Sequence, residues 1–202
     1  MKKTSKNYIM AIILGIAVGC LTLVGQKYLP ANLNFLANSG AVWLIPAFCV
    51  SYYSKSNKMN SIILCIVCLL FCVSGYYTFE AIMNHHGLSI NTWEIVWTVM
   101  AFVAGFVFGF GAYFANNNEN FLKYCGMNLL PAVFFSEGIN KLIHISDYSH
   151  MVPAVIMVTL IGLILYIIIN RKDIIKKNNI ISFAALSVLG LAGFEVLYRI
   201  SA

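Results

Sequence analysis

Residues 151–169, MVPAVIMVTLIGLILYIII, contain no charged side chain and are long enough to cross a membrane as one helix. The composition of the whole chain agrees, because 60% of its 202 residues are hydrophobic and only 10% are charged. A typical soluble domain has about 45–50% apolar and about 25% charged residues. We therefore expect an integral membrane protein, and backbone hydrogen bonding in lipid favours helices for runs of this length.

Six further apolar runs predict an all-α, polytopic bundle of seven transmembrane helices that forms a single domain over residues 1–202. The predicted helices lie near residues 8–24, 39–53, 61–79, 92–114, 121–143, 151–169 and 180–198. Seven spans of about 20 residues leave about 60 residues for loops and tails, so we expect no sizeable soluble domain. The second span is short and contains Pro46, and the fifth contains Pro131, Glu137 and Lys141, so these two are the least regular.

The first run begins after Lys2, Lys3 and Lys6, and a charged start of this kind is also typical of a signal peptide. Residues 17–20, AVGC, loosely resemble a lipoprotein cleavage site. The apolar stretch nevertheless continues through residues 21–24, and the later chain is equally membranous. We therefore expect a retained first helix.

The basic residues predict how the helices are oriented. With the N-terminus inside, ten of the thirteen Lys and Arg residues fall on the inner side, and only Lys27, Lys141 and Arg199 fall on the outer side. Because positive charge is retained on the cytoplasmic side, this orientation is favoured, and the C-terminus is expected outside. The net charge of +6 then reflects contact with anionic lipid, and we expect no nucleic-acid partner.

Small residues predict where helices pack closely. Gly15 and Gly19 stand four residues apart on one helix face, as do Gly105 and Gly109, and a neighbouring backbone can approach such a face. Residues 190–193 contain two more glycines and suggest a third close contact. We expect these seams to join helices within one chain.

The candidate functional residues gather on the predicted outer side, where all four histidines and five of the seven carboxylates are expected. Such a side can attract a cation and titrate between about pH 5 and 8. We predict a polar pocket there, formed by the second, third, fifth and seventh helices. Its candidate residues are Trp43, Tyr76, Tyr77, Glu80, Glu137, Lys141, His144, Glu195 and Arg199.

Part of this set has a purely structural alternative. Glu137, Asn140, Lys141 and His144 share one helix face and predict a polar stripe. Glu137 and Lys141 also have the spacing of an intrahelical ion pair, and so do Glu195 and Arg199.

Metal chemistry is the other alternative. His144, Asp147 and His150 form the pattern H-x-x-D-x-x-H, whose imidazoles and carboxylate suit a divalent ion such as zinc. Residues 65–72 place three cysteines on one helix face, which we interpret as small buried residues. The sequence contains no H-E-x-x-H, no G-x-S-x-G and no phosphate-binding glycine loop, so an enzyme is disfavoured. We assign no catalytic residue and predict no cofactor.

Four short motifs carry a resemblance to a known kind of protein: Tyr28-Leu29-Pro30, Ser39-Gly40-Ala41-Val42-Trp43, Gly75-Tyr76-Tyr77 and Ser136-Glu137-Gly138. Together they resemble a family of uncharacterised bacterial multi-pass integral membrane proteins. The resemblance implies a small protein of the bacterial cytoplasmic membrane with no assigned activity. It therefore transfers no catalytic residue.

Three functions stay open from the sequence. The favoured hypothesis is that the chain binds or transports a small solute or ion through the outward-facing polar pocket. The second is a non-catalytic accessory subunit or immunity protein, which requires a partner membrane subunit. The third is a metal-dependent membrane enzyme. In all three hypotheses the lipid bilayer surrounds the chain.

Overall fold

The computed structural model describes residues 3–85, 90–117 and 121–201, and all regular structure in these ranges is helical. Lys2, His86 and Glu119, which were counted above, lie outside the described residues. The long helices are α1 (Lys3–Tyr28), α3 (Gly40–Ser54), α4 (Lys58–Met83), α5 (Thr92–Asn117), α6 (Phe121–Ile143), α7 (Val152–Ile169) and α8 (Lys177–Ser201). The predicted all-helical class is confirmed, and each long helix coincides with one predicted run.

Two short elements were not predicted from the apolar pattern. The helix α2 (Asn34–Asn38) follows α1, and the 3-10 turn η1 (Ser149–Met151) precedes α7. Both are too short to give a periodic signal, since a helical pattern needs a window of about 11 residues or more.

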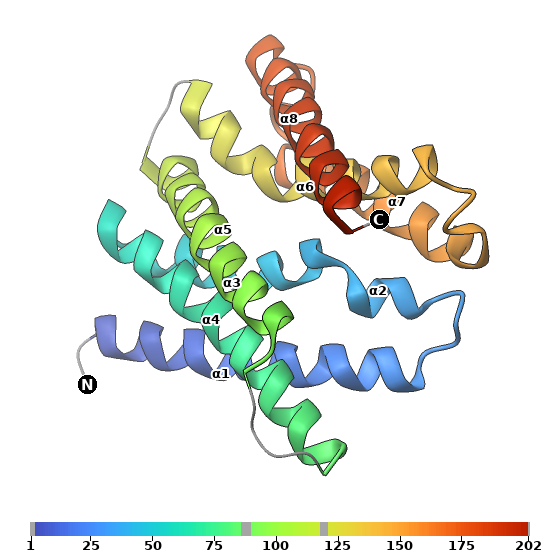
Figure 1. Cartoon of the computed structure of the whole chain (residues 1–202). Coiled ribbons are helices and arrows are strands. Elements are labelled where there is room, and N and C mark those ends of the chain that lie inside the picture. The colour runs from blue at the N-terminus through green and yellow to red at the C-terminus, as the bar shows by residue number, and fades with distance from the viewer. Residues whose placement is uncertain (1–2, 86–89, 118–120, 202) are drawn as a thin grey trace.

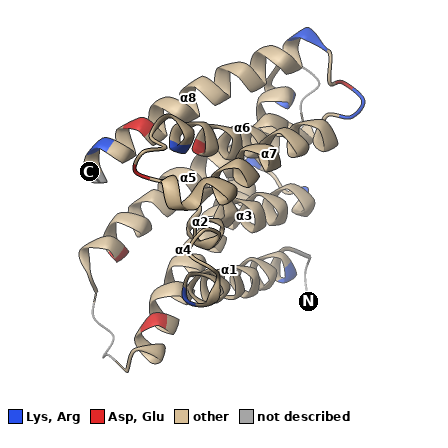
Figure 2. Cartoon of the chain, turned by 90° about the vertical axis from the view of Figure 1, so that its right-hand side faces the viewer, with Lys and Arg blue, Asp and Glu red and all other residues tan. Residues whose placement is uncertain are grey.

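Within the described ranges, five helices are long and apolar enough to cross a membrane, namely α1, α4, α5, α7 and α8. The α3 helix has only 15 residues, and α6 carries Lys123, Glu137 and Lys141. Figure 2 shows that charged residues gather mainly at helix ends and in loops, so that long stretches of helix are uncharged. The chain is thus a membrane protein with five helices of spanning character, and the count of seven stays a prediction.

The long helices pack in two groups. In the first group, α4 lies between α1 and α5 (Figure 1). A Cβ atom added at Gly19 of α1 would lie 2.7 Å from the backbone nitrogen of Tyr76, and closer still to the carbonyl oxygen of Cys72. On the other side of α4, a Cβ at Gly109 of α5 would lie 2.5 Å from the Cα of Ile62. The glycine seams of α1 and α5 are therefore confirmed, and both join helices within one chain.

The second group consists of α6, α7 and α8, and α6 packs against both of the others. Gly190 of α8 lies against Ser136 of α6, whereas a Cβ at Gly193 would meet open space. The predicted third seam is therefore formed by Gly190, and Gly193 does not take part in it.

Buried amides hold the second group together. Asn128 of α6 donates to Asn179 Oδ1 and Ser182 Oγ of α8, each at 2.7 Å, and accepts from Asn170 Nδ2 at 2.8 Å. All three asparagines are at most 1% exposed. We call these four residues the asparagine cluster, and they join α6 and α8 to the end of α7.

Replacing Asn128 with leucine keeps the volume and removes these hydrogen bonds. We expect Asn128→Leu to lower the free energy of unfolding by about 2 kcal/mol, because several interhelical bonds of about 0.6 kcal/mol each are lost and buried donors stay unpaired. The thermal unfolding midpoint in detergent measures this. The control is Asn178→Leu at an exposed position of α8, and equal midpoints for the two variants would contradict the role of the cluster.

The loop between α7 and α8 is tied to α6 near the same end. Tyr124 Oη donates to Asp173 at 3.2 Å, and Lys176 Nζ forms an ion pair with Asp173 at 2.8 Å. The hydrogen bond from Lys176 lowers the pKa of the Asp173 carboxyl below its ordinary value.

Two hydrophobic clusters meet at α6. The larger one is built from α1, α3, α4 and α5 and includes Leu130 of α6. The smaller one packs Phe35 and Ala41 from α2 and α3 against Phe134 and Val155 from α6 and α7. The start of α3 therefore lies where the two groups of helices join.

Candidate functional site

A cavity of about 280 Å³ lies between α1, α2, α3, α4 and α5, near the start of α3. Five aromatic side chains line it: Trp43 of α3, Tyr76 and Tyr77 of α4, and Trp93 and Trp97 of α5. The ring of Trp43 lies 6.1 Å from that of Tyr76 and 5.9 Å from that of Trp97, at interplanar angles of 50° and 49°. We call this cavity the aromatic pocket.

Hydrogen bonds to α1 fix two of these rings. Trp43 Nε1 donates to Thr22 Oγ1 at 2.8 Å, and Tyr76 Oη donates to Gln26 Oε1 at 2.8 Å. Gln26 in turn donates from Nε2 to Asn38 Oδ1 at 2.8 Å. The polar edges of Trp43 and Tyr76 are therefore engaged with the protein, so both rings are held in place in the wall of the pocket.

Glu80 supplies the charge of the aromatic pocket. Among the described residues that line it, Glu80 is the one charged side chain. Its carboxylate is half-buried and has no ion-pair partner in the described part of the chain. The wall of the pocket thus has a net negative charge beside aromatic rings.

Glu137 lies outside the aromatic pocket and stabilises its wall. This side chain is 4% exposed and accepts from Ser39 Oγ at 2.5 Å, from the Gly40 amide at 3.1 Å and from the Ala41 amide at 3.3 Å. Ser39 is the N-cap of α3, and its own side chain makes no capping hydrogen bond. The carboxylate of α6 therefore caps α3, where a helix N-terminus favours negative charge.

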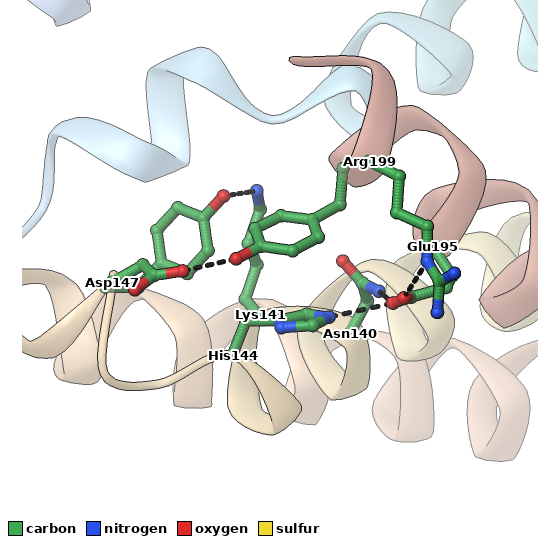
Figure 3. A network of polar contacts seen from close by, with 8 residues as sticks. Asn140, Lys141, His144, Asp147, Glu195 and Arg199 are labelled. Atoms are coloured by element: carbon green, nitrogen blue, oxygen red, sulfur yellow. Dashed lines mark hydrogen bonds and ion pairs between the residues drawn. The ribbon is translucent and has the colours of Figure 1, made fainter. Parts of the chain in front are cut away.

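A second polar cluster lies where the ends of α6 and α8 meet (Figure 3). His144 Nε2 lies 2.7 Å from Glu195 Oε2, and Asn140 Nδ2 donates to the same oxygen at 3.2 Å. Arg199 Nε donates to Glu195 Oε1 at 2.8 Å. The ring of His144 also stacks on Tyr198 at 3.8 Å. We call this set the α6–α8 network.

The sequence predicted two ion pairs as a structural alternative, and the structure contains one of them. The pair between Glu195 and Arg199 is confirmed. The pair between Glu137 and Lys141 is wrong, because Lys141 Nζ donates to Tyr148 Oη at 2.5 Å while Glu137 binds α3. The physical reason is that α3 offers Glu137 two backbone amides and a hydroxyl, which a single ammonium group does not match.

The nine residues assigned to one pocket therefore lie in three places. Trp43, Tyr76, Tyr77 and Glu80 share the aromatic pocket. Glu137 caps α3, and Lys141, His144, Glu195 and Arg199 lie at the far ends of α6 and α8. The pocket is formed by α1, α2 and α5 together with α3 and α4, and the fifth and seventh predicted helices do not line it, because α8 packs on α6.

Sequence reasoning missed several lining residues. Gln26, Asn38, Trp93 and Trp97 all line the aromatic pocket. Trp93 and Trp97 stand four residues apart on one face of α5, and Gln26 is a polar residue near the end of an apolar run. The sequence therefore contained a feature that could have identified each of these lining residues. An aromatic residue near a membrane boundary is ordinarily explained by the interface itself, which hides such a role.

No group of three or more His, Cys, Asp or Glu side chains within residues 3–85, 90–117 and 121–201 is placed to hold a metal ion. His144 is engaged with Glu195, and Asp147 accepts from Tyr198 (Figure 3). His144, Asp147 and His150 therefore form no group placed to hold a metal ion in the described part of the chain. Cys65 and its two neighbours on that face of α4 are fully buried, as the sequence interpretation expected.

The comparisons with known proteins leave the activity open. Neither the curated proteins nor the solved structures contain a match to this chain. One family model matches residues 1–202, and its description is a family of unknown function, DUF6518. This agrees with the resemblance to a family without assigned activity, and the chain belongs to the DUF6518 family of unknown function.

Proposed function

We propose that this protein, in a bacterial cytoplasmic membrane, binds or transports a small solute or ion through the aromatic pocket. The observation that supports this is a cavity of about 280 Å³ with five aromatic rings and one carboxylate. Sites for drug-sized ligands range over about 300–1,000 Å³, so a cavity slightly below that range suits a smaller molecule.

We also propose that the chain crosses the membrane seven times, with the N-terminus inside and the C-terminus outside. Interhelical hydrogen bonds support this topology because they join segments assigned to the same side. On the inner side, Asn116 Nδ2 donates to the carbonyl oxygen of Tyr52 at 2.6 Å. On the outer side, Trp43 donates to Thr22 and His144 pairs with Glu195. The aromatic pocket then faces outward.

The test uses a variant that fills the pocket. Gly40 lines the aromatic pocket, and a Cβ added there would meet nothing within 4 Å. We expect native mass spectrometry of the gently solubilised protein to detect a retained small molecule, and Gly40→Leu to lose it.

The matched control is Gly193→Leu. Gly193 also faces open space, but it lies in an apolar groove between α5 and α8. Retention by both variants would contradict a site in the aromatic pocket. A stable heteromer without any bound solute would also contradict the proposal and would favour the accessory subunit.

A further inference from the structure

We infer that the aromatic pocket takes an organic cation, namely a small molecule with an alkylated ammonium group. This inference rests on the proposed function, because it names the chemical class of the solute. It depends on three properties of the pocket: its charge, its ring surfaces, and the hydrogen bonds already made by its polar groups.

The charge of the pocket selects against anions. Its described lining contains Glu80 and no Lys or Arg. Glu80 also lacks an ion-pair partner among the described residues, so its charge is left to interact with a ligand. A half-buried carboxylate of this kind attracts a positive group more strongly than a fully hydrated one does.

The ring surfaces favour a diffuse positive charge. An ammonium group within about 6 Å of the centre of a Trp or Tyr ring is attracted by the ring quadrupole, and Trp is the best partner. Trp43 is tilted by about 50° to both Tyr76 and Trp97, and all three rings line the same cavity. Recognition of quaternary ammonium ligands by several aromatic side chains is a known use of this attraction.

The remaining polar groups of the pocket disfavour two other classes of ligand, namely neutral polyols and inorganic divalent cations. Hydrogen bonds to Trp43, to Tyr76 and between Gln26 and Asn38 already engage Thr22, Gln26 and Asn38. Besides Glu80, this leaves mainly the side chains of Tyr77 and Asn91 for a neutral polyol. A divalent cation such as calcium or magnesium instead requires about six oxygen ligands. The described lining offers one carboxylate, and no cluster of acidic or histidine side chains in the described chain is placed to hold a metal.

The experiment compares choline with 3,3-dimethylbutan-1-ol, which has the same shape and a carbon atom in place of the charged nitrogen. Binding to the full chain in detergent is followed by tryptophan fluorescence and by titration calorimetry at constant ionic strength. We expect choline to bind at least about fivefold more tightly than the neutral alcohol.

Two variants test whether the charge of Glu80 and the ring of Trp97 contribute to choline binding. Glu80→Gln should weaken choline binding about three- to tenfold and leave the neutral alcohol unaffected, and Trp97→Leu should weaken choline binding to a similar degree. The matched control is Glu94→Gln, which removes the same charge from α5 outside the pocket lining, and it should weaken choline binding less than Glu80→Gln does.

The outcomes separate this inference from the proposed function. Equal affinity for choline and the alcohol would overturn the organic cation and leave a pocket that binds solutes. If neither choline nor the alcohol binds, the assignment of an organic cation is also overturned. Native mass spectrometry of Gly40→Leu and Gly193→Leu would still decide the proposed function. If Glu94→Gln weakens choline binding as much as Glu80→Gln, the charge acts from the surface, and the assignment to the aromatic pocket is wrong.

Discussion

Glu137→Ala is expected to lower the free energy of unfolding by about 3 kcal/mol, because three donors at the start of α3 lose their acceptor together. Each buried donor left unpaired costs about 1–3 kcal/mol. The lost hydrogen bonds also connect α6 to α3 at the junction of the two helix groups. Thermal and denaturant unfolding of the protein in detergent micelles measures the effect.

Two further variants make this result specific. Glu137→Gln keeps one carbonyl acceptor and should fall between the wild type and Glu137→Ala. Glu94→Ala removes a carboxylate from a partly exposed position of α5 and should change stability by less than about 0.5 kcal/mol. If Glu137→Ala is as stable as Glu94→Ala, the carboxylate does not hold α3.

Gly19→Ala is expected to destabilise the protein, although alanine is a better helix former than glycine by about 1 kcal/mol. The added methyl group would lie 2.7 Å from the backbone nitrogen of Tyr76, so α1 and α4 must move apart. Overpacking of this kind costs about 1–3 kcal/mol or more. The net result is a lower unfolding midpoint, which differential scanning fluorimetry detects.

The control for Gly19→Ala is Gly193→Ala. A methyl group at Gly193 meets nothing within 4 Å, so only the helix preference acts there, and the unfolding midpoint should stay equal or rise. The two variants are chemically identical and are expected to shift stability in opposite directions. A rise for both would mean that the contact between α1 and α4 tolerates a side chain.

Local patterns predicted the parts of this structure that depend on neighbours in sequence. Apolar runs located the long helices, and the glycine spacing located the seams of α1 and α5, because both signals repeat within one helix. The pair between Glu195 and Arg199 is local in the same sense, since its two residues lie one turn apart on α8.

The contacts that build the candidate site are not local. Glu137 binds Ser39, which lies 98 residues earlier, and Tyr76 binds Gln26, which lies 50 residues earlier. A periodicity reports which face of a helix a residue occupies, but not which helix meets that face. For this reason Glu137 was placed in the predicted pocket, with its helix neighbour Lys141 as the alternative partner, and the contribution of Trp93 and Trp97 was missed.

The short length of α3 has a consequence for the depth of the aromatic pocket. Fifteen residues at about 1.5 Å each make a helix about 22 Å long, whereas the hydrocarbon core is about 30 Å thick. On the proposed topology, the end of α3 near Lys55 lies at the inner surface, so its start stops short of the outer surface. A cation that reaches the pocket from outside then crosses part of the membrane's electric field, and an inside-negative voltage favours its binding.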